Sequence, residues 1–162
     1  MLTVSSPAIV SLALPLADEG ATARLAATLA KLARPGDVIA LAGELGSGKT
    51  SFARAFIRAI GDPAEEVPSP TFSLVQTYET QAGPIWHFDL YRLGRAEEAL
   101  ELGLEDALAE AIVLIEWPER LGALLPEERL ELRLDADATP DSRVAWITAR
   151  GFWAERVAGL RA

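Results

Sequence analysis

Residues 43–50 read Gly-Glu-Leu-Gly-Ser-Gly-Lys-Thr and match G-x-x-x-x-G-K-[ST], the pattern of a phosphate-binding loop. Glycines let the backbone curl, so that successive N–H groups face phosphate oxygens. Lys49 carries a compact positive charge that can reach the β- and γ-phosphates. Thr50 offers a hydroxyl oxygen, the kind of ligand that Mg²⁺ prefers. These residue types in this spacing indicate a nucleoside triphosphate as the ligand.

Flanking segments give this loop the context that the chemistry needs. Residues 37–42 form a short apolar run suited to a buried strand. Residues 51–61 place Phe52 and Phe56 on one helical face, and Gly61 is a natural helix stop. The loop therefore joins a strand to a helix N-terminus, where the helix dipole favours anions. A chance glycine-rich turn explains this arrangement less well.

Two carboxylates follow or lie within further apolar strands. Glu116 comes directly after the apolar run 111–115, where an acidic residue completes the magnesium shell of P-loop enzymes. A solvated carboxylate at a strand end is the alternative interpretation. Asp89 lies in the run 87–92, His-Phe-Asp-Leu-Tyr-Arg, and can orient water or the metal shell. His87 is the sole histidine, so we interpret it as a structural residue rather than a metal ligand.

Three other positions stay open on local sequence alone. The hydroxyls of Ser69-Pro70-Thr71 can sense a γ-phosphate, but ordinary turn chemistry explains them better. Trp117 follows Glu116 and either packs at the strand exit, covers the nucleotide or faces a partner. Arg92 can approach a phosphate or pair with an acidic neighbour.

The composition is that of one globular domain over residues 1–162, with 50% hydrophobic and 24% charged residues. The net charge of −9 argues against a broad nucleic-acid surface but leaves a local basic patch, or a partner that holds the nucleic acid, open. The absence of cysteine excludes disulfides and cysteine-based zinc sites. Residues 1–17 lack a basic n-region and contain two prolines, so we expect neither a signal peptide nor a membrane span.

The remaining segments predict an α/β fold with a mixed parallel and antiparallel sheet flanked by helices. Residues 129–134 and 143–149 alternate apolar and polar side chains, as antiparallel strands with one solvated face do. Residues 71–80 and 85–90 are expected to form a hairpin. The other expected elements are a strand over 9–14 and helices over 19–32, 94–109 with a break at Gly103, and 152–160.

Together these motifs resemble the TsaE family of bacterial proteins, also called YjeE. The matching segments are GELGSGKT at 43–50, SPTF at 69–72, HFDLYRL at 87–93, ELGLED at 101–106 and IEWPERL at 115–121. They occur in that order and cover about residues 36 to 122. The phosphate loop alone indicates only an NTPase, whereas HFDLYR with a downstream EWP is far more specific.

The resemblance implies a P-loop ATPase core and a Mg²⁺-dependent ATPase that is slow alone. It implies a role in forming N6-threonylcarbamoyladenosine (t6A) at position 37 of tRNAs that read ANN codons. The implied partners are TsaD and TsaB, the pair that transfers the threonylcarbamoyl group. The tRNA would be reached indirectly through them. A cytoplasmic location without membrane contact is implied as well.

The resemblance also implies roles for single residues. ATP or ADP would be held by Gly43, Glu44, Leu45, Gly46, Ser47, Gly48, Lys49, Thr50, Ser51 and Trp117. Mg²⁺ would be held by Thr50, Glu116 and Asp89, and the catalytic set would be Lys49, Asp89, Glu116 and Thr71 as a γ-phosphate switch. The first strand and first helix would contribute to the adenine pocket. A small-molecule kinase and a nucleotide-gated binding module remain the alternatives.

Overall fold

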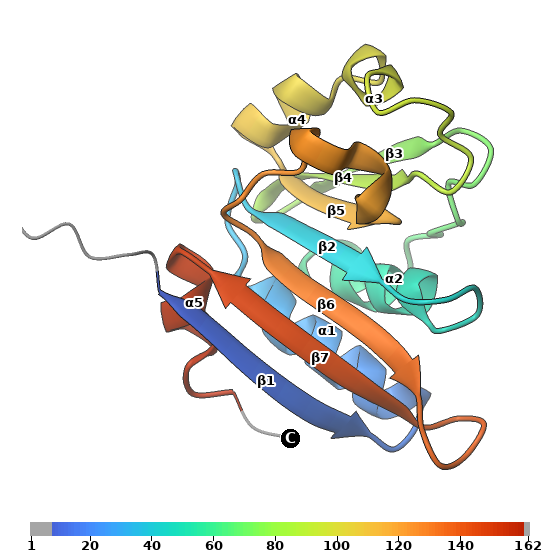
Figure 1. The fold of residues 1–162 in the computed structure, drawn as a ribbon, viewed down its shortest axis with the longest axis vertical. Coiled ribbons are helices and arrows are strands. Elements are labelled where there is room, and N and C mark those ends of the chain that lie inside the picture. Colours follow the sequence, from blue (N-terminus) through green and yellow to red (C-terminus); the bar gives the residue numbers. More distant parts are fainter. Residues whose placement is uncertain (1–7, 161–162) are drawn as a thin grey trace, which may run out of the picture.

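A seven-stranded mixed sheet runs through residues 8–160, the part of the chain that this computed structural model describes (Figure 1). The prediction of no signal peptide falls in part on residues 1–7, which lie outside the described residues. The elements in chain order are β1 (Ile9–Leu16), α1 (Glu19–Leu32), β2 (Val38–Ala42), α2 (Lys49–Ile60), β3 (Val75–Thr80), β4 (Gly83–Asp89), α3 (Glu98–Glu101), α4 (Leu104–Glu110), β5 (Ile112–Glu116), the 3₁₀ helix η1 (Pro118–Leu124), β6 (Leu130–Ala136), β7 (Arg143–Arg150) and α5 (Phe152–Val157).

The strand order is β1-β7-β6-β2-β5-β4-β3. The central strands β6, β2, β5 and β4 run parallel, whereas β1, β7 and β6 pair antiparallel on one side and β3 pairs antiparallel with β4 on the other. The predicted mixed sheet and α/β class are therefore confirmed. Parallel strands end at a common edge, so the loops after β2, β4 and β5 lie together.

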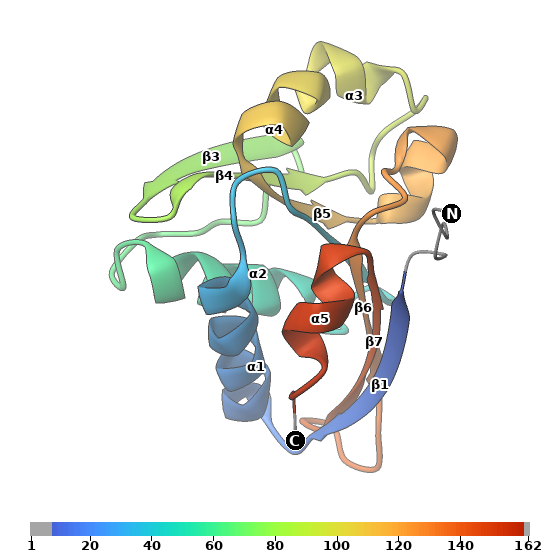
Figure 2. The same ribbon diagram turned by 90° about the vertical axis from the view of Figure 1, so that its left-hand side faces the viewer.

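Each face of the sheet carries its own apolar core. On one face α1, α2 and α5 pack through side chains such as Leu29, Phe56 and Trp153, as the grouping of these helices in Figure 2 shows. On the other face α3, α4 and η1 cover β4 and β5 through a second cluster that includes Phe88 and Ile115. Fully buried strands on both faces explain the nearly continuous apolar sequences of β2 and β5.

Local sequence sets the ends of the helices beside the site. The Asp18 carboxylate caps α1 by accepting a hydrogen bond of 2.8 Å from the Ala21 backbone N–H. The helix α2 begins at Lys49, directly after Gly48 in the left-handed conformation, two residues earlier than predicted. No helix within residues 8–160 combines the length and the apolar character that crossing a membrane requires.

The predicted hairpin is present, but the structure differs from the sequence analysis at two places. The predicted strand over 71–80 begins only at Val75, because Leu74 has left-handed backbone dihedrals and its N–H closes a turn on the Pro70 carbonyl at 2.7 Å. Phe72 lies in this turn, ahead of the strand, and is 84% exposed. The helix η1 was not predicted, since Pro118 begins a 3₁₀ segment in a stretch without clear helical periodicity.

Candidate functional site

Three chain segments converge at the carboxyl ends of the central strands. The phosphate loop follows β2, Asp89 is the last residue of β4, and Glu116 is the last residue of β5. In the sheet register Glu116 lies beside both Leu41 and Asp89. Sequence segments separated by dozens of residues are thus brought to one edge, which is where ligands bind in open α/β sheets.

The phosphate loop has the backbone that only glycine adopts freely. Gly43, Gly46 and Gly48 have φ angles of 139°, 78° and 105°. At Gly43 a Cβ atom would also lie 2.7 Å from the Leu134 carbonyl oxygen, so the loop passes too close to β6 for a side chain. These glycines therefore fix the curled path that turns backbone N–H groups inward.

Lys49 folds back over this loop. Its Nζ donates to the carbonyl oxygens of Gly43 and Glu44, each at 2.7 Å, and more weakly to Ser47 Oγ at 3.4 Å. The same ammonium lies 4.3 Å from the centre of the Trp117 ring. Burial lowers the pKa of Lys49 below its ordinary value, and nearby carboxylates, Glu116 foremost, oppose that shift. The contact with Ser47 is thus the longest of the three.

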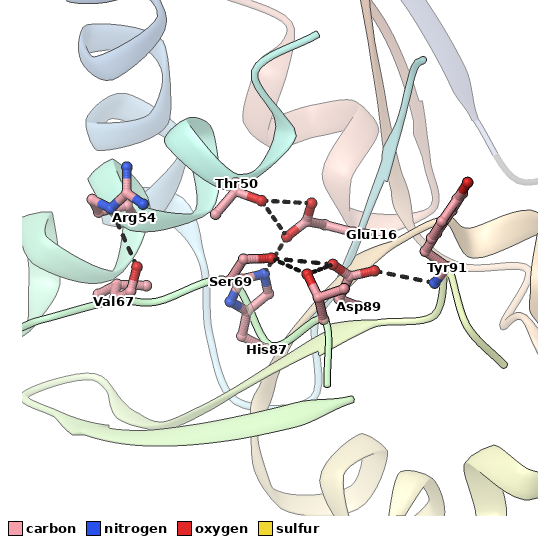
Figure 3. A network of polar contacts seen from close by, with 9 residues as sticks. Thr50, Arg54, Val67, Ser69, His87, Asp89, Tyr91 and Glu116 are labelled. Atoms are coloured by element: carbon pink, nitrogen blue, oxygen red, sulfur yellow. Dashed lines mark hydrogen bonds and ion pairs between the residues drawn. The ribbon is translucent and has the colours of Figure 1, made fainter. Parts of the chain in front are cut away.

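Thr50 and Glu116 form the second part of the site, as Figure 3 shows. The Thr50 hydroxyl lies 2.9 Å from Glu116 Oε1 and 3.2 Å from Oε2. A carboxylate only accepts, so the hydroxyl donates its proton and keeps its lone pairs for another group. Glu116 is 2% exposed, and its Oε2 also contacts His87 Nε2 at 2.6 Å. Glu116 is therefore a held and buried group rather than a solvated strand end.

Asp89 organises the loop that precedes β3. Its Oδ2 lies 3.3 Å from the hydroxyls of both Ser69 and Thr71, which are 2.7 Å from each other. Its Oδ1 accepts a hydrogen bond of 3.1 Å from the Tyr91 backbone N–H. The loop itself is tied to α2, because Arg54 Nε donates to the Val67 carbonyl at 3.2 Å (Figure 3). Thr71 thus lies in a turn rather than in the predicted strand, and its hydroxyl is connected to the site by its contact with Asp89.

A cavity of about 260 Å³ joins these parts. It is lined by Leu45, Gly46, Gly48, Lys49, Thr50, Ser51, Ser69, Thr71, Asp89, Glu116 and Trp117. Its side-chain oxygen groups are four hydroxyls and two carboxylates, among them Thr50, Asp89 and Glu116. Residues 8–160 contain no cluster of three or more histidine, cysteine or acidic residues that would form a complete metal cage. That set fits Mg²⁺, which is usually bound by one or two carboxylates together with substrate phosphates.

Trp117 has an unusual backbone for its size. Its φ and ψ are 59° and 52°, the left-handed region that a bulky residue rarely adopts. The ring contacts that of Tyr91, with a centroid separation of 5.0 Å, and packs against the Lys49 ammonium. Such strain persists only where surrounding contacts impose it, and it is frequent at functional sites. The structure thus puts Trp117 at the rim of the cavity.

Arg143 is a site residue that the sequence analysis missed. From β7 its Nε donates to the Ser47 carbonyl at 3.0 Å and its Nη2 to the Gly46 carbonyl at 3.3 Å. It also lines a second cavity, of about 200 Å³, together with loop residues and with Glu19 and Thr22 of α1. An arginine in an alternating strand carries no local signal of this role, because the contact joins residues almost one hundred positions apart.

Two other predicted positions are less engaged. Arg92 does not line the 260 Å³ cavity, and its guanidinium lies 4.7 Å from the centre of the exposed Phe72 ring. Leu45 lines the cavity but is 69% exposed at the tip of the loop. His87, interpreted from the sequence as a structural residue, is in direct contact with Glu116.

Comparison with known proteins gives a consistent set of relatives. The model of the family described as "Threonylcarbamoyl adenosine biosynthesis protein TsaE" matches residues 16–144. The "tRNA threonylcarbamoyladenosine biosynthesis protein TsaE" of Rickettsia felis is 43% identical over 120 residues, which is 74% of this chain and 70% of that protein. The Bacillus subtilis protein of the same name is 36% identical over 131 residues, 80% of each. The crystal structure of Bacillus subtilis YdiB has a TM-score of 0.76 and 30% identity, covering 94% of this chain and 95% of that one.

Proposed function

This chain belongs to the TsaE family of threonylcarbamoyl adenosine biosynthesis proteins, and on that premise we propose that it binds and hydrolyses ATP in the service of tRNA t6A formation. The observation that carries the proposal is the joining of the phosphate loop to Glu116 and Asp89 in one cavity. A chance glycine-rich turn would not bring two carboxylates from neighbouring strands to its lysine and threonine.

We assign the triphosphate to the 260 Å³ cavity and its inward-curled loop. Lys49 would exchange its long Ser47 contact for a phosphate oxygen while keeping its two carbonyl partners. The nucleoside would extend toward the 200 Å³ cavity beside Glu19 and Thr22, in keeping with the expected contribution of the first helix. Because α2 begins at Lys49, its N-terminus, the positive end of the helix dipole, lies at the site and favours an anion there.

Hydrolysis joins a water oxygen to the γ-phosphorus and breaks its bond to the β,γ-bridging oxygen, so that ADP and phosphate leave. Asp89 is our candidate for orienting this water and receiving its proton, because one of its oxygens faces the cavity hydroxyls of Ser69 and Thr71. Lys49 and the loop N–H groups offset the charge that develops on the phosphoryl oxygens. Mg²⁺, held by Thr50 with Glu116 and Asp89, supplies further charge neutralisation when bound.

The side chains that line the cavity favour slow ATP hydrolysis by the isolated chain. No arginine from residues 8–160 lines it, whereas fast NTPases present an arginine to the transition state in cis or in trans. Large apolar side chains stand exposed on or next to residues that line the cavity. Leu45 lines it, Phe72 follows the lining residue Thr71 and Tyr91 contacts Trp117, and these side chains are 69%, 84% and 38% exposed. Aromatic and aliphatic groups of this kind are typical of protein-binding surfaces. We therefore propose that TsaD and TsaB bind over these side chains and complete the site, with tRNA reached through them.

The nucleotide site is tested by Lys49→Ala and Glu116→Ala, measured with a fluorescent ADP analogue and in an ATPase assay. Lys49→Ala should weaken nucleotide binding, because it removes the phosphate cation. Glu116→Ala should lower Mg²⁺-dependent hydrolysis more than nucleotide binding. Unchanged ATP affinity in Lys49→Ala would remove the assignment, and full activity in Glu116→Ala would take that residue out of the site. Arg95→Ala, at an arginine whose side chain is 78% exposed, is the control.

A further inference from the structure

His87 is buried, and only one of its two ring nitrogens has a hydrogen-bond partner in the described residues. It has no exposed surface, and its Nε2 lies 2.6 Å from Glu116 Oε2. Its other ring nitrogen, Nδ1, is buried without a hydrogen-bond partner among residues 8–160. On β4 it points to the same face as Ile85, and across the sheet it pairs with Leu114, both members of the apolar core against α2. An imidazole in such surroundings needs an explanation.

The partners decide which ring nitrogen carries the proton in this contact. An ionised carboxylate only accepts hydrogen bonds, so His87 Nε2 must donate to Glu116. A proton on Nδ1 would be a buried donor with no acceptor, which is costly. The ring therefore presents its N–H to Glu116 and its unprotonated nitrogen to the apolar core.

This N–H completes the restraint of Glu116. The Thr50 hydroxyl reaches Oε1 at 2.9 Å and Oε2 at 3.2 Å, and has a single proton to share between them. Without His87, the 2%-exposed carboxylate would have that one donor and could turn about its side-chain torsions. With His87, Glu116 Oε2 accepts a second hydrogen bond, from Nε2, and the carboxylate is held in the orientation in which it contacts Thr50 and lines the cavity.

We propose that His87 is a positioning residue that holds the Glu116 carboxylate in the orientation required for the Mg²⁺–nucleotide complex. The inference rests on the proposed nucleotide site and adds a group to it that touches neither nucleotide nor metal. Partners behind a metal-binding side chain typically change metal affinity by about 10- to 100-fold when they are removed. A histidine that merely fills space would change stability but not the magnesium dependence of binding.

The first test compares three substitutions of the same side chain. His87→Leu removes the donor, His87→Asn places an amide near the Nδ1 position, and His87→Gln carries an amide N–H out to about the Nε2 position. Each variant and the wild type are titrated with a fluorescent ADP analogue in Mg²⁺ and in EDTA. Ile85→Val, on the same buried face, is the control for core packing.

We expect affinity in EDTA to be similar in all variants. The gain in affinity on adding Mg²⁺ should fall about tenfold or more in His87→Leu and His87→Asn, and His87→Gln should recover most of it. An undiminished gain in His87→Leu would overturn the proposal, as would an equal loss in His87→Gln. If His87→Leu does not fold, the contrast between His87→Gln and His87→Asn decides. A wild type without any gain would contradict the proposed nucleotide site instead.

A second test needs neither metal nor nucleotide. The chain contains one histidine, so a ¹⁵N-labelled sample without a histidine tag shows a single imidazole in NMR spectra. We expect the proton on Nε2 and a clear change of that signal in Glu116→Gln, with a smaller change in Asp89→Asn. A proton on Nδ1, or a signal indifferent to Glu116→Gln, would show that His87 does not hold this carboxylate.

Discussion

Two glycines of the phosphate loop provide a matched pair for testing how tightly the loop is built. Gly43→Ala and Gly46→Ala are the same chemical change, and both positions have left-handed φ angles, 139° and 78°. The left-handed region costs an alanine about 1–2 kcal/mol relative to glycine. On backbone strain alone, the two variants should lose similar stability.

Space separates the two positions. At Gly46 a Cβ atom meets no atom within 4 Å, whereas at Gly43 it would lie 2.5 Å from Ser47 Oγ and 2.7 Å from the Leu134 carbonyl oxygen. The Ser47 side chain can rotate away, but the Leu134 carbonyl belongs to β6 and moves only with the sheet. Overpacking of this kind costs about 1–3 kcal/mol. Gly43→Ala should therefore lose about 2–5 kcal/mol in total, against about 1–2 kcal/mol for Gly46→Ala.

The assay is urea unfolding of both variants without nucleotide, so that ligand binding does not enter the comparison. The predicted signature is a lower midpoint for Gly43→Ala at a similar denaturant slope. Equal midpoints, or a greater loss in Gly46→Ala, would show that the loop does not pass as close to β6 as the structure has it.

Three further predictions concern Arg143, Tyr78 and Asp89. Arg143→Ala should weaken ADP binding about tenfold, since hydrogen bonds to the Gly46 and Ser47 carbonyls worth about 1–1.5 kcal/mol are lost, and affinity equal to that of Arg95→Ala would contradict this role. Tyr78→Phe should be neutral or stabilising by about 1 kcal/mol, because the Tyr78 hydroxyl is buried without a partner in the described residues. Burial, and then Glu65, raise the pKa of Tyr78 above its ordinary value of 10.0. Wild-type stability should therefore fall as pH rises past 10.0, and the stability of the Phe variant should fall less, as urea midpoints measured below and above that pH would show. Asp89→Ala should leave ADP binding measurable while abolishing ATP turnover, and a fluorescent nucleotide titration beside a phosphate-release assay separates the two effects.

Much of the central architecture was predictable because its signals are local. The apolar runs before the phosphate loop and before Glu116 are typical of strands buried on both faces, and both became neighbouring parallel strands. The loop pattern fixed the positions of Lys49 and Thr50 in advance. Once two strands end at one sheet edge, the meeting of Thr50 with Glu116 follows from geometry.

The contacts that sequence could not supply join residues through space without a local pattern. Arg143 reaches the loop from β7, and its place in an alternating strand predicts only a half-solvated position. His87 was judged by the absence of a second histidine, a criterion suited to metal ligands but blind to a hydrogen bond behind a carboxylate. The predicted start of the strand at residue 71 was wrong because the turn at Leu74 requires a left-handed backbone, which a leucine rarely adopts.

We propose that this chain is an ATPase whose site TsaD and TsaB complete in t6A formation. The most direct measurement is its ATP hydrolysis alone and with purified TsaD and TsaB, together with Asp89→Ala under both conditions. We predict slow turnover alone, strong stimulation by the pair, and loss of both activities in Asp89→Ala. No stimulation, with no detectable complex in either ATP or ADP, would rule out a site that these partners complete.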